Sequence, residues 1–194
     1  CQMSIEAAEG RGFEKALLNV GGGQQVLEEG TRKNLRVMVD DLGLAAEIFS
    51  RIKDALPKTF KGHSLVGLNE RLRILKYHPG DFFAIHKDGN YTREISKITM
   101  LFYLNEGYEG GETTFYKPAG NQVNLKVIPK TGMILLHDHR IDHGVPELEK
   151  GVKYVIRTDV MYSERADTKY VDSELSNKQA GHKRSEGKSP CSIM

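Results

Sequence analysis

Residues 80–88 read Gly-Asp-Phe-Phe-Ala-Ile-His-Lys-Asp, a turn signal and a short apolar segment that end in a histidine and an aspartate. Side chains two positions apart on a strand project to the same side, so a strand here would direct His86 and Asp88 toward one metal ion while Lys87 points away. A His-x-Asp pair alone is commonly just polar surface. The metal-site hypothesis therefore depends on residues further along the chain.

Three histidines compete to complete the site. Residues 131–136 (Thr-Gly-Met-Ile-Leu-Leu) are a candidate strand that leads into His137, His139 and His143. We favour His143, because a glycine and a proline directly after it indicate a turn, and a predicted strand over residues 151–162 returns from that turn. Composition alone does not choose among the three, so His137 and His139, as a strand end and a loop residue, stay open as alternatives.

Two imidazoles and one carboxylate can hold Fe(II) on one face and leave three positions open. We therefore predict that His86, Asp88 and His143 are the metal ligands and the catalytic centre. Lys153 comes ten positions after His143 and can hold the far end of a dicarboxylate cosubstrate. This combination predicts a 2-oxoglutarate-dependent dioxygenase that uses Fe(II) and O2.

Alternation along two predicted strands, residues 98–103 and 151–162, places polar groups on inward faces. The side chains on these faces are Thr99, Leu101 and Tyr103, and Lys153, Val155 and Arg157. A carboxylate enclosed there needs a cation and hydroxyl donors, which Lys153 and Tyr103 would supply. Arg157 is a rival cation, because its guanidinium suits a carboxylate. In the alternative, Arg157 forms a structural ion pair with Asp159 or another acid.

Six blocks, in order between residues 66 and 163, resemble the catalytic domain of prolyl 4-hydroxylases within the Fe(II)/2-oxoglutarate oxygenase superfamily. The blocks are residues 77–80, 86–88, 103–105, 110–115, 129–132 and the segment from His143 to Tyr154. The resemblance implies that His86, Asp88 and His143 bind iron, that Lys153 binds the distal carboxylate, and that Tyr77 and Tyr103 contact the cosubstrate.

The resemblance also implies the chemistry. Oxidative decarboxylation of 2-oxoglutarate would give succinate, CO2 and a ferryl species that hydroxylates the substrate, with ascorbate as a further requirement. The chain departs from the family pattern after Arg157, where residues 158–162 replace a tryptophan-bearing end, and the whole chain has no Trp. A peptidyl proline is the expected substrate. Hydroxylation of a small molecule or of another residue, and a binding module without turnover, are the alternatives.

The fold expected is mainly β with flanking helices, a double-stranded β-helix or jelly roll, because short strands with turn signals succeed one another from Glu70 onward. Residues 13–20 predict a first strand and residues 21–32 a loop. A helix is predicted from Asp41 to Pro57. Its apolar stripe consists of Leu42, Ala45, Ile48, Phe49 and Ile52.

The 194 residues are expected to form one domain over residues 1–164, with the motif-bearing core at 66–163, and a disordered polar tail over residues 165–194. A formal net charge of +2 argues against a nucleic-acid partner. Cys1 and Cys191 stand at opposite ends of the chain, so no disulfide framework is expected. No apolar run approaches the roughly 20 residues of a transmembrane helix. Because the sequence begins with Cys instead of Met, the absence of a leader carries no information about targeting.

The C-terminal residues Cys191-Ser-Ile-Met match a prenylation pattern in which the final Met favours a farnesyl group. One lipid with a few basic residues upstream would give weak, reversible attachment to a cytoplasmic membrane face. The serine is not aliphatic, and an ordinary solvated terminus is the alternative. A cytoplasmic location is the expectation in either case.

Overall fold

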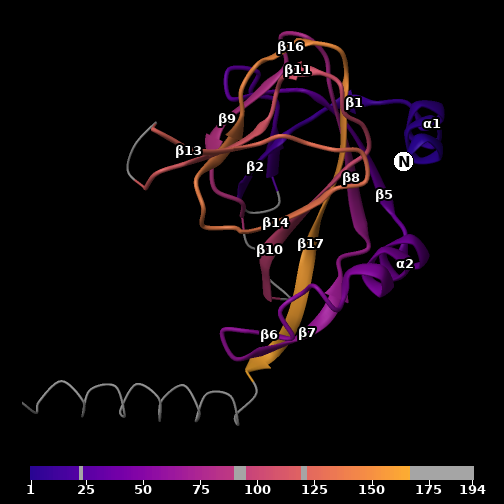
Figure 1. The fold of residues 1–194 in the computed structure, drawn as a ribbon, viewed down its shortest axis with the longest axis vertical. Helices are drawn as coiled ribbons and strands as arrows, with labels where there is room; N and C mark the ends of the chain where they lie inside the picture. The colour runs from indigo at the N-terminus through magenta and orange to yellow at the C-terminus, as the bar shows by residue number, and fades with distance from the viewer. Residues whose placement is uncertain (22–23, 90–94, 119–121, 167–194) are drawn as a thin grey trace, which may run out of the picture.

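The computed structural model describes residues 1–21, 24–89, 95–118 and 122–166. These residues form two principal antiparallel β-sheets, with two helices on one outer side (Figure 1). The helices are α1 (Gln2–Arg11) and α2 (Leu42–Ile52). The predicted fold, mainly β with flanking helices in a double-stranded β-helix, is confirmed.

The larger sheet has eight strands in the path β1-β5-β8-β17-β10-β14, with β7 beside β17 and β6 beside β7. Their bounds are β1 (Glu14–Lys15), β5 (Leu35–Asp40), β6 (Thr59–Phe60), β7 (His63–Leu68), β8 (Arg71–Tyr77), β10 (Ile95–Tyr103), β14 (Ile134–Asp138) and β17 (Lys153–Ala166). The long strand β17 lies between β8 and β10. Its register sets Lys153 opposite Tyr77 of β8.

The smaller sheet has five strands in the order β13-β12-β15-β9-β4. They are β4 (Arg32–Lys33), β9 (Phe82–His86), β12 (Thr113–Tyr116), β13 (Val123–Val127) and β15 (His143–Val145). Two two-stranded sheets complete the described strands: β2 (Leu18–Gly21) with β3 (Gln24–Val26), and β11 (Glu109–Gly110) with β16 (Leu148–Lys150).

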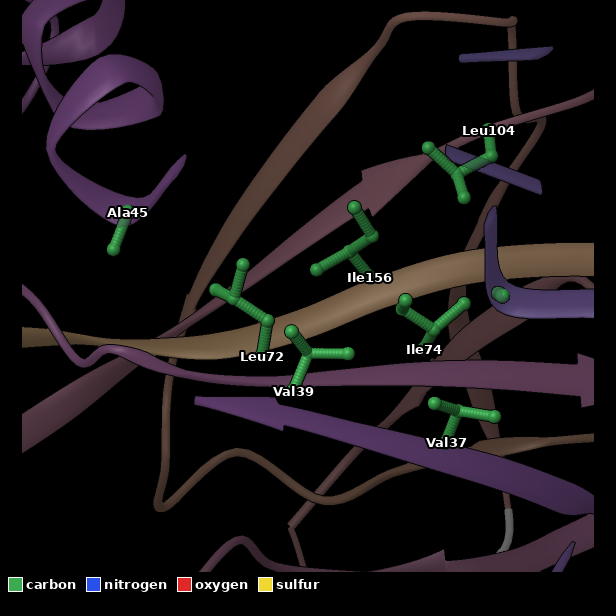
Figure 2. Close-up of a cluster of buried hydrophobic side chains, with 8 residues drawn as sticks. Val37, Val39, Ala45, Leu72, Ile74, Leu104 and Ile156 are labelled. Atoms are coloured by element: carbon green, nitrogen blue, oxygen red, sulfur yellow. The ribbon is translucent and has the colours of Figure 1, made fainter. Parts of the chain in front are cut away.

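The outer face of the larger sheet is covered by the two helices. Ala8 of α1 and Ala45 of α2 belong to one buried cluster with side chains of β5, β8 and β17 (Figure 2). The strand residues of this cluster are Val37, Val39, Leu72, Ile74 and Ile156. Each fully buried aliphatic side chain contributes on the order of 1.5–3 kcal/mol to folding. The opposite, inner face carries a second buried cluster that includes Leu75, Leu101 and Val155 beside Tyr77 and Tyr103.

Helix α2 begins as predicted. Asp41 is its N-cap, and the Asp41 carboxylate accepts a hydrogen bond from the Leu44 backbone N–H at 2.9 Å. The predicted continuation to Pro57 is wrong, because the helix ends at Ile52. Leu56, beyond that end, is buried in a third cluster with Ile48 and residues of the strands, so packing of a non-helical segment outweighs its local helical pattern.

We expect Asp41→Ala to lower the free energy of unfolding by about 1 kcal/mol, because the Leu44 N–H loses its acceptor at the helix start. Asp41→Asn is the matched control, since its side-chain carbonyl can still accept that hydrogen bond. Urea titration followed by far-ultraviolet circular dichroism measures both variants. Equal losses in both variants would show that the cap contributes nothing.

Two further local expectations are wrong. Residues 13–20 contain two short strands, β1 and β2, instead of one, and residues 21–32 contain β3 and the start of β4 instead of a loop. Strands β5, β6 and β7 and helix α1 were not predicted. Strands of two to four residues are too short to show alternation. Helix α1 buries only Ala8, so its sequence has no apolar stripe from which a helix could be predicted.

No helix within the described ranges is long and apolar enough to cross a membrane. Strand β17 extends to Ala166, and residues 167–194, including Cys191, lie outside the described residues. The polar tail, its boundary after residue 164 and the prenylation of Cys191 stay predictions.

Candidate metal and cosubstrate site

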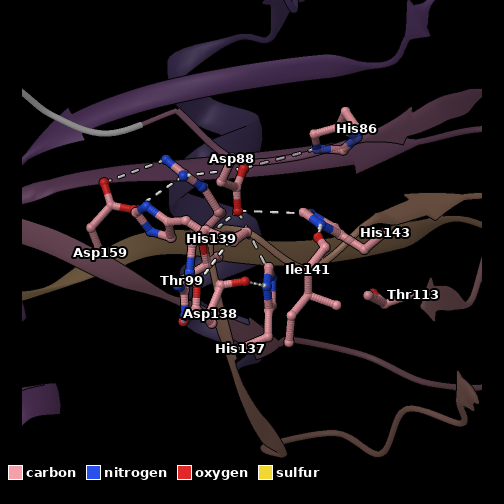
Figure 3. Close-up of polar contacts among 12 residues, drawn as sticks. His86, Asp88, Thr99, Thr113, His137, Asp138, His139, Ile141, His143 and Asp159 are labelled. Atoms are coloured by element: carbon pink, nitrogen blue, oxygen red, sulfur yellow. Dashed lines mark hydrogen bonds and ion pairs between the residues drawn. The ribbon is translucent and has the colours of Figure 1, made fainter. Parts of the chain in front are cut away.

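The predicted histidine and aspartate ligands meet between two adjacent strands. Strand β9 ends at His86, strand β15 begins at His143, and the two residues lie directly opposite each other. With Asp88, two positions beyond β9, they offer ligand atoms that all lie within 4.8 Å of one another (Figure 3). Lys87 is exposed, and its Nζ lies 3.6 Å from Asp142 Oδ1, so it points away as predicted.

Backbone carbonyls orient both imidazoles. The Nδ1 of His86 lies 2.8 Å from the Ala84 carbonyl oxygen, and the Nδ1 of His143 lies 3.0 Å from the Ile141 carbonyl oxygen. A carbonyl oxygen only accepts, so we assign the proton to Nδ1 in each ring. Each Nε2 therefore presents a lone pair, which is the arrangement found at metal-ligating histidines.

The charge states of these groups suit a divalent cation. Burial lowers the pKa of His86 to about 4, so its ring is neutral near pH 7. Burial alone would raise the pKa of Asp88, but Arg157, His143 and the hydrogen bond from Thr99 lower it overall, so this carboxylate is ionised. The nearest Nε2 contacts to Asp88 are 3.9 Å from His86 and 3.7 Å from His143. Two imidazoles, each with Nε2 toward one ionised carboxylate, form a donor set that fits Fe(II).

Two side chains from the larger sheet hold Asp88. The Thr99 hydroxyl donates to Asp88 Oδ2. An Nη2 atom of Arg157 lies 3.4 Å from Asp88 Oδ1 and 3.1 Å from Asp159 Oδ1. The structure thus contains the ion pair of Arg157 with Asp159 that was one of the two alternatives. The contact of Arg157 with Asp88 was not anticipated, because sequence periodicity does not relate strands of different sheets.

Lys153 is buried, with 1% of its surface exposed. Its Nζ donates to the Gly111 carbonyl at 2.7 Å and lies 5.2 Å from the ring centroid of Tyr77 and 5.8 Å from that of Tyr103. Burial lowers the pKa of Lys153 to about 7, although the charge of Glu112 acts to raise it. In the described ranges no carboxylate pairs with this ammonium, so an anionic ligand would fit beside it.

Tyr108 and Thr113 also belong to this pocket but were not singled out from the sequence. The Tyr108 ring centroid lies 6.0 Å from Lys153 Nζ. Its hydroxyl is buried and has no hydrogen-bond partner among the residues that the structure describes. The Tyr103 hydroxyl donates to Thr113 Oγ1 at 2.7 Å. Tyr108 lies in a loop, where the two-residue alternation used for the strands carries no information.

The two rival histidines lie at the end of β14 and just beyond it, as expected, but both are buried. The Nε2 of His139 lies 3.4 Å from Asp159 Oδ1. Asp159 and Asp88 both contact the Arg157 guanidinium. The turn predicted directly after His143, which favoured this histidine as the second ligand, is wrong, because Gly144 lies inside β15. A Cβ at Gly144 would meet the Phe83 carbonyl oxygen at 3.0 Å, so the glycine permits the close approach of β15 to β9.

A family model described as the 2OG-Fe(II) oxygenase superfamily matches residues 72–158, a range that holds the three clustered residues and Lys153. Residues 72–158 therefore carry the sequence pattern of this superfamily. The match supports a 2-oxoglutarate-dependent dioxygenase, and the family implies Fe(II), 2-oxoglutarate and O2. The predicted enzyme class is confirmed.

Similar proteins come from viruses, bacteria and animals. An uncharacterized protein of fowlpox virus (strain NVSL) is 30% identical over 102 residues, which cover 52% of this chain and 23% of the viral protein. A prolyl hydroxylase from Trichoplax adhaerens, in complex with a peptide fragment of the hypoxia inducible factor oxygen degradation domain, matches with a TM-score of 0.64 at 18% identity, over 84% of this chain and 76% of that chain.

Two further structures share the fold. A Pseudomonas putida prolyl-4-hydroxylase matches with a TM-score of 0.61 at 18% identity, over 85% of this chain and 84% of that one. The viral collagen prolyl hydroxylase of Paramecium Bursaria Chlorella virus-1, in its 2-oxoglutarate complex, matches with a TM-score of 0.58 at 17% identity, over 83% and 88% of the two chains.

Proposed function

We propose that this dioxygenase hydroxylates peptidyl proline, with Fe(II) bound by His86, Asp88 and His143 and with 2-oxoglutarate bound through Lys153. The observation that carries this proposal is the convergence of the three ligand atoms within 4.8 Å. Lys153 and Arg157 share one face of β17, four residues or about 13 Å apart, and Arg157 contacts Asp88. Lys153 therefore shares an inward face with the residue that holds Asp88, and its ammonium can bind the far carboxylate of a diacid held at the metal ligands.

Each protein group has a defined task in this scheme. The bound ion supplies the oxygen activation, which is cofactor chemistry. The Lys153 ammonium binds the distal carboxylate, and Tyr77 and Tyr103 line the cosubstrate pocket. Arg157 serves by holding Asp88, through the ion pair at 3.4 Å, instead of binding the cosubstrate. Ascorbate dependence stays a prediction from the family resemblance.

The choice of proline draws on the neighbours' names, which describe prolyl hydroxylases, one of them in complex with a peptide. A second candidate, hydroxylation of a small molecule or of another residue, is favoured by the sequence after Arg157. There the Thr158 hydroxyl donates to the Asn69 carbonyl at 2.8 Å, and Asp159 pairs with Arg157. These residues stabilise the sheet, and they leave substrate recognition to other parts of the chain.

The deciding experiment incubates the protein with Fe(II), 2-oxoglutarate and a library of proline-containing peptides, beside the same library with alanine at every proline. We expect succinate release and a mass gain of one oxygen atom on proline, in the first library only. Oxygen added to another residue, or to a small molecule in a cell extract, would support the second candidate. Asp88→Ala is the inactive control. If the wild-type protein never forms succinate, the proposal of an active dioxygenase is wrong.

A further inference from the structure

A third imidazole, that of His137, lies against the proposed metal ligands. His137 is directly opposite Thr99 in the β10–β14 pair, and Thr99 donates to Asp88. The His137 side chain is only 2% exposed. Its ring centroid lies 4.3 Å from that of His143, the same separation as between the rings of His86 and His143 (Figure 3). The His143 ring thus has an imidazole on each of two sides.

The proton of the His137 ring can be assigned from its surroundings. Its Nδ1 lies 3.2 Å from the Asp138 carbonyl oxygen, which can only accept, so Nδ1 carries the proton. Nε2 therefore presents a lone pair. This atom is buried, and it has no hydrogen-bond partner within the part of the chain that the structure describes.

The group that His137 Nε2 faces cannot satisfy it. Asp88 Oδ2 lies 3.9 Å away, too far for a hydrogen bond, and an ionised carboxylate is itself an acceptor. Two acceptors facing each other in a buried site call for a cation between or beside them. The distance equals the 3.9 Å from His86 Nε2 to Asp88 Oδ1. His137 therefore repeats the features of His86 and His143: a carbonyl at Nδ1 and a lone pair at Nε2 directed toward Asp88.

We propose that His137 is a fourth protein ligand, so that the metal site without cosubstrate consists of three imidazoles and one carboxylate. His137 stands outside the compact group of His86, Asp88 and His143 and approaches it from the side of Asp88 and His143. It is consequently the ligand that is held least firmly. This proposal concerns metal binding alone and does not depend on which substrate is hydroxylated.

Binding of the cosubstrate would change this coordination. This extension rests on the proposed function. Four protein ligands leave two positions on a six-coordinate ion, whereas chelation by 2-oxoglutarate and binding of O2 require three. His137 is the ligand displaced when 2-oxoglutarate binds. The protein would thus protect its metal in the absence of cosubstrate and open the oxygen position only after 2-oxoglutarate has arrived.

The test counts imidazoles on the metal directly. The full chain is loaded with one equivalent of Co(II), without 2-oxoglutarate, and the hyperfine-shifted exchangeable proton signals are counted by 1H NMR. Each neutral imidazole bound through Nε2 contributes one Nδ1–H signal. We expect three signals from wild-type protein and two from His137→Phe, which keeps an aromatic ring against Phe115. Co(II) affinity should fall on the order of tenfold or more in that variant.

The matched control is His63→Phe, because the Nδ1 of His63 also lies against a carbonyl, that of Ser163 at 2.8 Å, yet His63 is outside the cluster. Its signal count should stay at three. Two signals from wild-type protein would overturn the proposal even if no variant folded. Adding 2-oxoglutarate should reduce three signals to two. A count that stays at three with 2-oxoglutarate bound would contradict the displacement, and the absence of 2-oxoglutarate binding would instead count against the proposed function.

Discussion

Asp88→Ala is expected to reduce Fe(II) affinity by more than about 100-fold and to abolish succinate formation. Asp88 is the carboxylate of the cluster that holds His86 and His143, and removing a direct ligand costs more than the 10- to 100-fold typical of an outer partner. The fold should survive, because Arg157 keeps its ion pair with Asp159 at 3.1 Å. Titration of Fe(II) under anaerobic conditions measures the affinity, and circular dichroism checks the fold.

The histidine variants test the choice among the candidates. His86→Ala and His143→Ala should lose Fe(II) binding and turnover in the same way. His139→Ala should keep both, because the His139 side chain contacts Asp159, and its backbone carbonyl, which accepts from the Asp88 N–H at 3.0 Å, is unchanged in that variant. Activity retained by His143→Ala together with its loss in His139→Ala would reverse the assignment of the second imidazole ligand.

Lys153→Met is expected to raise the 2-oxoglutarate requirement by one to a few orders of magnitude, with little change in Fe(II) affinity. The cosubstrate carboxylate would then be buried without its cation, which costs on the order of 2–5 kcal/mol. Methionine fills the volume of the lysine stem among Tyr77, Tyr103 and Tyr108, so the pocket stays packed. Arg157→Ala should affect the 2-oxoglutarate KM less. The opposite ordering would transfer the role to Arg157.

The same lysine predicts a pH dependence. Burial lowers the pKa of Lys153 to about 7, so the ammonium is complete below that pH and is lost as the pH rises through it. The affinity for 2-oxoglutarate should be constant below about pH 7 and fall above it, by up to tenfold per unit. Lys153→Arg is the matched control, because a guanidinium stays protonated. A flat profile in wild-type protein, measured by calorimetry with Mn(II) in the site, would contradict this prediction.

The local pattern was sufficient for several parts of this protein. The two-residue repeat of a strand placed His86 and Asp88 on one side and Lys87 on the other, and it placed Thr99 and Tyr103 on the inner face of β10. The N-cap of α2 at Asp41 was evident from residue type alone. Such features depend on neighbours in the sequence, whose relative directions are set by backbone geometry. Strands of two to four residues and the weakly apolar α1 lack that regularity, and they escaped notice.

By itself, then, the sequence indicated the fold class, the His-x-Asp pair, the lysine near the start of the last strand and the resemblance to a dioxygenase family. Only the tertiary structure showed where the three candidate histidines lie: β15 sets His143 opposite His86, His137 approaches Asp88 from β14, and the His139 side chain contacts Asp159. It also decided that Arg157 contacts Asp88 and that Tyr108 lies beside Lys153. These are contacts between strands and loops far apart in the chain, and no local periodicity encodes which strands pair or in what register.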